Sequence, residues 1–298
     1  MATCKNCGKT LILRGGKCFY CGQNPHETIV SSSSNQTPYT KYVGQNHIID
    51  AQNDRFGNAQ GSQYDLSKDG AFKGYTIIVL CLYQCIDVPS KNIMANSTPA
   101  LQKKGFRTIT FGLDATKDIN LLHKELNNDK CQLWIISDMT NRLTPDCCNL
   151  IYNHFNKGRG LYIWSDNEPY YADANVILRR LFNTEMSGCY VGDHVLSVQS
   201  IQNTPGIVKG HPITTGIQNF YEGITISNVR LTQNLKPLVY SSDGKVVTAY
   251  YDMYGKRGLI DGGFTRLYCK WNSAGTDRFV VNCASWLANI ETFGYTRQ

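Results

Sequence analysis

The chain has 298 residues, of which 42% are hydrophobic and 18% charged. Its 30 Lys and Arg residues against 23 Asp and Glu residues give a formal net charge of +7. This balance excludes a fully disordered chain, which combines low hydrophobicity with high net charge. A chain of this length forms one or two domains and buries a core large enough to fold without disulfides.

Targeting signals are absent from the sequence pattern. The longest apolar run, residues 75–83, is far shorter than the ~20 residues that a membrane-spanning helix needs. Residues 1–25 are basic but hold no long apolar stretch, which argues against a secretory signal peptide. We therefore expect a cytoplasmic protein without membrane contact, with the nucleus as an alternative. Its twelve cysteines are expected to be reduced or metal-bound.

The first element, residues 1–25, is predicted to be a zinc ribbon. Two CxxCG turns place four thiolates at the spacing that tetrahedral zinc requires, and the candidate ligands are Cys4, Cys7, Cys18 and Cys21. So small a module folds only with its metal. It resembles zinc ribbons built from two CxxCG knuckles, which implies a structural Zn²⁺ and a docking role toward protein or nucleic acid.

Residues 26–70 are predicted to form a flexible polar linker. This stretch contains four consecutive serines and many Asn and Gln residues, with few large aliphatic side chains and no clear period. The third region, residues 71–298, has the composition of a globular domain.

Strand and helix signals alternate in the first half of this domain. Buried strands are predicted at residues 75–83, 107–111, 132–137 and 161–165, and helices at residues 91–104, 119–126, 145–156 and 172–182. Asp118 and Thr144 are candidate N-caps, and Pro145 suits a first helical position. Four strand–helix units in a row predict an α/β fold, with a parallel sheet covered by helices on both faces.

The second half changes pattern. Short strands are predicted at residues 188–198, 223–229, 237–241, 245–251 and 258–261, followed by an amphipathic helix at residues 279–290. We therefore expect the mostly parallel, doubly wound sheet to gain added strands here.

An Asp residue follows or ends nearly every predicted parallel strand. The series comprises Asp87, Asp114, Asp138, Asp166 and Asp261. Ligands of open parallel sheets bind beyond the carboxyl ends of the strands. Asp138, Asp166, Asn167 and Asp261 are therefore candidate ligand-binding residues, and clustered carboxylates there suit Mg²⁺ or Ca²⁺. The alternative is structural, since Asp is a good helix N-cap.

Three stretches carry a resemblance to a known family. They read GRGLYIWSDNEPYYADANVILRRLF, GHPITTGI, and GLIDGGFTRLY with GTDRFVVNCASWL. Residues 72–290 resemble the class I glutamine amidotransferase-like superfamily. Within it they are most similar to non-amidotransferase branches related to trehalose-utilisation-like proteins and to a domain of intraflagellar-transport proteins. The resemblance implies a flavodoxin-like sheet with a nucleophile-elbow position after one strand.

The family's Cys–His–Glu triad is not found in this sequence. The turn that matches the elbow is Trp164-Ser165-Asp166-Asn167, which has neither Cys nor flanking Gly. The last histidine, His211, is followed by Pro212 rather than by x-Glu. We therefore expect a non-catalytic binding or scaffold protein whose zinc ribbon docks a protein partner.

Two alternatives remain. One is a hydrolase that uses the strand-end residues, either with a metal or with a nucleophile. Ser165 or Cys85 would be the nucleophile, His194 or His211 the base, and Asp166 or Asp261 the orienting acid. The other is a nucleic-acid-binding protein, which would need its basic residues to share one face.

Overall fold

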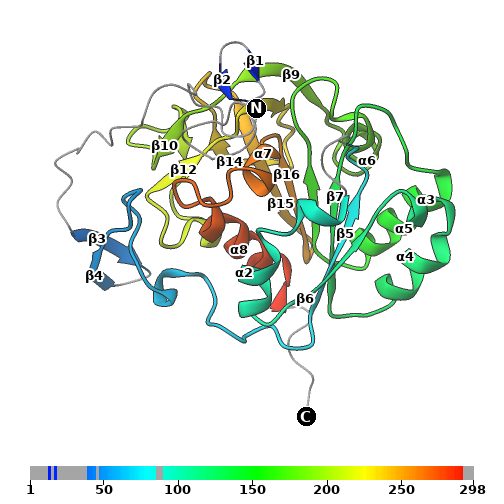
Figure 1. The fold of residues 1–298 in the computed structure, drawn as a ribbon, viewed down its shortest axis with the longest axis horizontal. Helices are drawn as coiled ribbons and strands as arrows, with labels where there is room; N and C mark the ends of the chain where they lie inside the picture. The colour runs from blue at the N-terminus through cyan, green and yellow to red at the C-terminus, as the bar shows by residue number, and fades with distance from the viewer. Residues whose placement is uncertain (1–12, 15–16, 19–38, 45–46, 85–89, 291–298) are drawn as a thin grey trace.

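The computed structural model describes residues 13–14, 17–18, 39–44, 47–84 and 90–290 (Figure 1). Its centre is an eight-stranded sheet with the strand order β11-β14-β15-β16-β8-β7-β5-β6. Five strands run parallel to one another, namely β5 (Thr76–Cys81), β6 (Arg107–Phe111), β7 (Cys131–Ile136), β8 (Leu161–Trp164) and β16 (Lys256–Asp261). The order β6-β5-β7-β8-β16 is the doubly wound, flavodoxin-like arrangement.

The predicted added strands extend this sheet on one side. They are antiparallel to their neighbours and comprise β15 (Val246–Met253), β14 (Lys236–Tyr240) and β11 (Gly206–Ile207). Two further pairs lie outside the sheet. They join β9 (Met186–Val191) to β13 (Thr225–Val229) and β10 (Val195–Ser197) to β12 (Asn219–Tyr221).

Helices pack on both faces of the sheet, as the alternating pattern predicted. One face carries α1 (Ser90–Ile93), α2 (Thr98–Lys103), α7 (Thr265–Tyr268) and α8 (Thr276–Leu287). The other carries α3 (Asp114–Lys117), α4 (Ile119–Leu126), α5 (Pro145–Asn156) and α6 (Ala172–Phe182). All residues of β5 and β7 are buried, because a sheet covered on both faces leaves neither side of its central strands in water.

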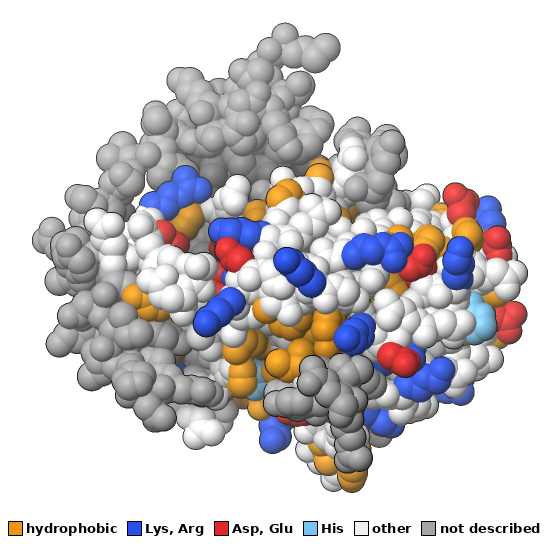
Figure 2. Space-filling view, turned by 90° about the horizontal axis from the view of Figure 1, so that it is seen from below, with side chains coloured by type: hydrophobic (Ala, Val, Ile, Leu, Met, Phe, Trp, Pro, Cys, Tyr) orange, Lys and Arg blue, Asp and Glu red, His pale blue; other side chains and the backbone are white. Residues whose placement is uncertain are grey.

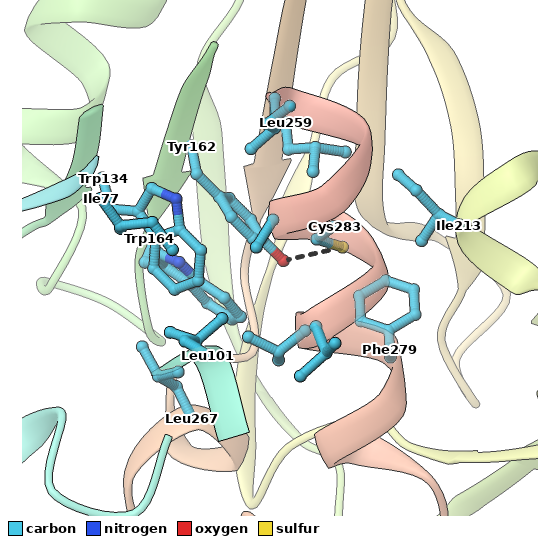
Figure 3. Packing of buried hydrophobic residues seen from close by; sticks show 14 of the residues in the cluster. Ile77, Leu101, Trp134, Tyr162, Trp164, Ile213, Leu259, Leu267, Phe279 and Cys283 are labelled. Atoms are coloured by element: carbon cyan, nitrogen blue, oxygen red, sulfur yellow. Dashed lines mark hydrogen bonds between the residues drawn. The ribbon is translucent and has the colours of Figure 1, made fainter. Parts of the chain in front are cut away.

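Each face has its own core. Alternate residues of β5 divide between them, so that Ile77 and Val79 join one cluster while Ile78 and Leu80 join the other. Figure 3 shows the cluster under α8, where the Tyr162 hydroxyl oxygen lies 3.6 Å from Cys283 Sγ. Burial raises the pKa of the Cys283 thiol well above its ordinary value, so this cysteine packs as an unreactive thiol.

Two predicted caps are confirmed. Asp118 accepts a hydrogen bond from the N–H of Asn120 at the start of α4, and Thr144 accepts one from the N–H of Cys147 at the start of α5.

The predicted single helix at residues 91–104 is wrong, because the chain forms α1 and α2 with a break between them. Pro99 lies in the first turn of α2 and lacks an N–H, which suits a helix start rather than a helix interior.

The second half of the stretch predicted as a linker packs on the α/β domain. Tyr64 is buried, the N–H of Leu66 donates to Asn282 on α8, and Asp65 forms an ion pair with Arg278 at 2.9 Å. Asn58 reaches across to accept hydrogen bonds from the N–H groups of Gln218 and Asn219. The prediction of a flexible linker therefore does not hold for residues 58–66, whose polar side chains and backbone form specific hydrogen bonds with the domain.

Smaller elements complete the described chain. Two antiparallel hairpins join β1 (Leu13–Arg14) to β2 (Lys17–Cys18) and β3 (Tyr39–Gly44) to β4 (His47–Gln52). Two 3-10 turns are η1 (Ser62–Tyr64) and η2 (Pro212–Thr214). Within the described ranges, every helix falls short of the length and apolar character needed to cross a bilayer.

Candidate functional site

The carboxyl edge of the sheet is where the predicted site residues meet. Asp114, Asp138 and Asp166 follow β6, β7 and β8, and Asp261 ends β16. Because these strands are parallel, their carboxyl ends share one edge, as predicted. We call this edge the rim. Cys85 and Asp87 lie outside the described residues.

Asp261 is held in a fully buried network. One carboxylate oxygen accepts from the Arg266 guanidinium and from the N–H of Gly263, and the other accepts from the Tyr162 hydroxyl at 3.1 Å. Both Asp261 and Arg266 have no exposed surface. Arg266 also donates to Thr248 Oγ1 and to the backbone carbonyl of Glu222. This carboxylate compensates a buried guanidinium and is not available to a ligand.

Another segment of the same chain covers the ends of β8 and β16. The N–H of Ser227 on β13 donates to the carbonyl of Gly262. A Cβ on Gly262 would lie 2.0 Å from the carbonyl oxygen of Ser227, and one on Gly263 would lie 2.3 Å from that of Glu222. Gly262 and Gly263 therefore allow two backbone segments to cross closely, and they leave no space for a ligand to approach the backbone there.

Ser165, at the position that matches the elbow, is sealed inside this crossing. Its side chain is buried, and its Oγ contacts Met186 Sδ at 2.9 Å and Ser227 Oγ at 3.0 Å. Its N–H donates to the carbonyl of Asp261. None of the hydrogen-bond partners found for Ser165 Oγ is a base.

Asp166 and Asn167 connect the end of β8 to the antiparallel pair of β9 and β13. Asp166 Oδ1 accepts from the N–H of Asn167 at 2.9 Å and from Thr225 Oγ1 on β13 at 3.1 Å. The Asn167 amide donates to the carbonyl of Glu168 and contacts Cys189 Sγ. These bonds hold β13 against the rim.

Asp138, at the end of β7, faces Arg142 at 3.4 Å across an ion pair. Its other carboxylate oxygen is buried without a hydrogen-bond partner among the described residues. Its N–H donates to the fully buried Asp173 on α6, whose carboxylate also accepts from the N–H groups of Arg142 and Leu143. Burial raises the pKa of Asp173, and the three backbone donors oppose that rise.

His194 stands apart from Ser165 and contacts a buried carboxylate instead. Its Nδ1 lies 2.6 Å from the carbonyl of Gly192 and 3.2 Å from Glu222 Oε1, so it is placed to donate to both. Glu222 has no exposed surface and is fixed by the N–H and hydroxyl of Ser242, each at 2.7 Å. The His194 side chain is 61% exposed. This pair forms a carboxylate–histidine dyad.

His211 acts as a cap at another place in the fold. Its Nδ1 accepts from the N–H of Ile213 at the start of η2, and its ring packs on Tyr250 and Trp286. Burial, together with the nearby Arg257 and Lys236, lowers the pKa of His211 to about 4. Neither Ser165 nor a rim carboxylate is among these partners.

The carboxylates of the rim do not converge. In the part of the chain that the structure describes, no group of three or more His, Cys, Asp and Glu side chains is arranged to hold a metal ion. Mg²⁺ or Ca²⁺ at the rim therefore stays a prediction. The side chains of Cys4, Cys7, Cys18 and Cys21 lie outside the described residues.

Comparison with known proteins supports the fold and goes no further. No family model and no curated protein matches the sequence. Among solved structures, a cytoplasmic protein from Salmonella typhimurium is similar over 70% of this chain and 98% of its own, with a TM-score of 0.50 and 9% identity.

Two other similar structures have lower scores. A ThuA-like protein from Parabacteroides merdae matches 75% of this chain and 92% of its own, with a TM-score of 0.46 and 11% identity. A protein described as a GMP synthase component, from Thermoplasma acidophilum, matches 74% and 98%, with a TM-score of 0.44 and 12% identity.

Sequence reasoning missed Glu222 and Arg266, the two residues that organise the rim. Glu222 is a single acidic residue between Tyr221 and Gly223, and this local pattern does not predict that its side chain is buried. Arg266 lies five residues after Asp261, which is the only signal that the two charges neutralise each other.

Proposed function

We propose that this chain is a non-catalytic binding or scaffold protein. In this proposal it combines an N-terminal zinc ribbon with a non-amidotransferase member of the amidotransferase-like superfamily. The observation that carries the proposal is the environment of Ser165. A nucleophile needs a base within hydrogen-bond reach and access to substrate. Ser165 is 1% exposed, and its hydroxyl contacts a thioether and another hydroxyl.

Two other rim residues, Asp261 and Asp166, support the same interpretation. Asp261 neutralises Arg266, and Asp166 binds Thr225. Each therefore has a structural partner that a substrate or catalytic base would have to displace. Breaking the buried ion pair leaves an uncompensated charge, at a cost of about 3–5 kcal/mol.

Turnover assays on the full chain test the non-catalytic part. We expect hydrolysis of glutamine and of p-nitrophenyl acetate at the rate of buffer, for the wild type and for Ser165→Ala alike. Turnover above buffer that disappears in Ser165→Ala would overturn the proposal. An active serine esterase assayed in parallel shows that the conditions allow detection.

Metal analysis tests the ribbon. We expect one Zn²⁺ per chain, and its loss in the double variant Cys4→Ser/Cys7→Ser, because removing two thiolates leaves an incomplete tetrahedral site. Cys189→Ser is the matched control, since Cys189 is an exposed free cysteine of the α/β domain and its loss should leave the zinc content unchanged. Less than half an equivalent of zinc in the wild type would contradict the assignment.

We propose that the occupied ribbon docks a protein. The face in Figure 2 gives little support to nucleic acid, because its Lys and Arg side chains alternate with acidic and uncharged residues. Binding to generic duplex DNA or RNA that falls steeply with salt would favour nucleic acid instead. Protein partners captured by the wild type should be lost from Cys4→Ser/Cys7→Ser and kept by Cys189→Ser.

One observation favours a hydrolase as the second candidate. The His194–Glu222 dyad has the geometry of a base oriented by a carboxylate, with the imidazole largely exposed. If the protein is a hydrolase, any turnover should fall in His194→Gln and Glu222→Gln while Ser165→Ala keeps it. That result would place catalysis at the dyad and outside the elbow.

A further inference from the structure

The two outermost strands of the eight-stranded sheet differ in how their outer sides are covered. On one side the sheet ends at β11, which is two residues long, and a bridge between Val198 and Ile207 covers its outer side. On the other side it ends at β6 (Figure 1), whose five residues pair only with β5 among the described residues. The outer side of β6 is therefore the side where a further strand fits.

Two residues of β6 direct their backbone groups to this outer side. The N–H of Arg107 donates to the Tyr75 carbonyl, so the backbone of Arg107 faces β5. Backbone groups point alternately to the two sides of a strand, so the N–H and C=O groups of Thr108 and Thr110 point outward. Within the described ranges, neither threonine is paired with another strand on that side. These two residues offer two donors and two acceptors at the spacing of a β-ladder.

β6 lacks the features by which exposed strands usually avoid pairing with other chains. Such features are Pro, Lys, a bulge or a very short strand. β6 has the sequence RTITF, and it keeps a regular register with β5 over all five residues. Its one charged residue, Arg107, starts the strand and forms an ion pair with Glu125 on α4 at 3.3 Å. The other four are strand-favouring residues and are half-buried, which suits pairing with a strand of another chain.

We propose that a second copy of this chain pairs here, with the two β6 strands antiparallel about a twofold axis at Ile109. This register pairs all five residues of both strands. Thr108 lies opposite Thr110 of the second copy, and each of the two such pairs exchanges two hydrogen bonds. Ile109 packs against its own copy, and the aliphatic stem of Arg107 covers the ring of Phe111. The two Arg107 charges lie at opposite ends of the pair, so like charges do not meet.

An exposed leucine on α4 favours a second copy as the occupant. Leu121 is 45% exposed and precedes Glu125 by four residues, so both lie on one stripe of the helix. This stripe faces β6, because Glu125 pairs with Arg107. Four helical residues and two strand residues each span about 6–7 Å, which puts Leu121 near the level of Ile109. The twofold axis therefore brings Leu121 of both copies to the same face of the joined sheet.

Sedimentation velocity of the full chain under reducing conditions, from micromolar to submillimolar concentration, tests this proposal. We expect a monomer–dimer equilibrium with a dissociation constant on the order of micromolar, because a few hydrogen bonds and side-chain pairs make a small interface. A wild type that stays monomeric over the whole range would overturn the proposal.

Two charge variants test the register. Ile109→Lys and Ile109→Glu each place like charges opposite each other at the twofold axis, so each alone should dimerise at least 10-fold more weakly. An equimolar mixture should restore the dimer, because opposite charges then meet. Val191→Lys is the matched control, since Val191 is 76% exposed on β9 and should dimerise like the wild type. A mixture of the two folded variants that stays monomeric would contradict the register.

Thr110→Pro tests the backbone pairing without adding a charge. It removes an outward N–H and keeps the N–H groups that bind β5, and Pro is tolerated in an outermost strand. Dimerisation should weaken at least 10-fold, whereas Thr110→Val, which keeps the N–H, should still dimerise. A dimer formed through another part of the chain would persist in Ile109→Lys and in a folded Thr110→Pro protein, and that result would overturn the proposal. The outcome is independent of zinc binding and of catalysis at the rim.

Discussion

The two edges of the central sheet differ in how their buried arginines are neutralised. At the carboxyl edge, Asp261 binds Arg266, Tyr162 and the N–H of Gly263, and β13 covers it. At the amino edge, Arg159 is nearly as buried, yet the carboxylate that it pairs with, Asp129, is 83% exposed. Both edges also hold buried atoms without a partner among the described residues, so an unpaired atom does not distinguish them. These atoms are Asp138 Oδ1 and Arg266 Nε at the carboxyl edge, and His154 Nδ1 and Arg159 Nε at the amino edge.

This difference shows what a buried charge means for function. A strand-end carboxylate indicates a binding site only when it has unused hydrogen-bonding capacity, and a sequence does not report that capacity. Along the rim, Asp138 alone among the candidate carboxylates combines near-complete burial with an oxygen that lacks a partner in the described structure. The other candidates connect β8 and β16 to the added strands.

Removing the Asp261 carboxylate should have the largest effect. Asp261→Asn leaves the Arg266 guanidinium buried and uncompensated, which should lower the free energy of unfolding by about 3–5 kcal/mol. Urea denaturation of the variant and the wild type measures this difference in the free energy of unfolding. Asp252→Asn is the matched control, because Asp252 pairs with Arg257 at 3.7 Å and its side chain is 45% exposed, so its loss should cost under about 1 kcal/mol. Equal stability of the two variants would contradict a structural role for Asp261.

The second-largest loss in the free energy of unfolding should come from adding a side chain at the strand crossing. Gly262→Ala places a methyl group against the Ser227 carbonyl, and the resulting overpacking should cost about 3 kcal/mol. Gly244→Ala is the comparison, since its added Cβ meets nothing within 4 Å and only its positive φ is strained, at about 1 kcal/mol. A Gly262→Ala protein as stable as wild type would reopen the rim as a place where a ligand approaches the backbone.

The pH dependence of stability should reveal the half-buried histidine His211. Its pKa of about 4 lies below the unfolded value of 6.5, so the unfolded state binds the proton first. Stability is therefore complete above pH 6.5 and is lost as the pH falls toward 4, at up to about 1.4 kcal/mol per pH unit. His211→Gln should make the slope of urea-derived stability against pH shallower across this window. His154, whose pKa burial lowers to about 3, still contributes its own slope. An unchanged slope would mean that His211 is not buried as described.

Truncating the sealed hydroxyl should have the smallest effect. Ser165→Ala removes its hydrogen bond with Ser227, which should cost about 1 kcal/mol in urea denaturation. A loss above 3 kcal/mol would show that the Ser165 hydroxyl carries more of the crossing than one neutral hydrogen bond.

Sequence reasoning predicted the parallel sheet well because its signals are local. The span of α6 and the caps Asp118 and Thr144 follow from patterns within a few residues. The hydrogen-bond partners of the rim residues could not be predicted in this way, since Tyr162 and Asp261 are 99 positions apart in the chain. The prediction of a flexible linker missed the packing of residues 47–70 for the same reason. Asn58 accepts a hydrogen bond from Asn219, which begins a strand 161 positions later in the chain.

The surroundings of His154 were also beyond sequence reasoning. His154 sits on the buried side of an amphipathic helix, beside Ile151 and Phe155. Neither its tautomer nor the unmet Nε of Arg159 can be deduced before the fold buries the two side chains. Burial by itself was predictable from periodicity, whereas a missing partner was not.

Labelling of the full chain with a fluorophosphonate, followed by peptide mass mapping, tests the closed rim most directly. This reagent modifies serines that are both activated and accessible. The account predicts no adduct on the peptide that contains Ser165 under conditions that fully label a serine hydrolase in the same tube. An adduct on Ser165 that disappears in His194→Gln would contradict the account, because it would show an open elbow with a working base.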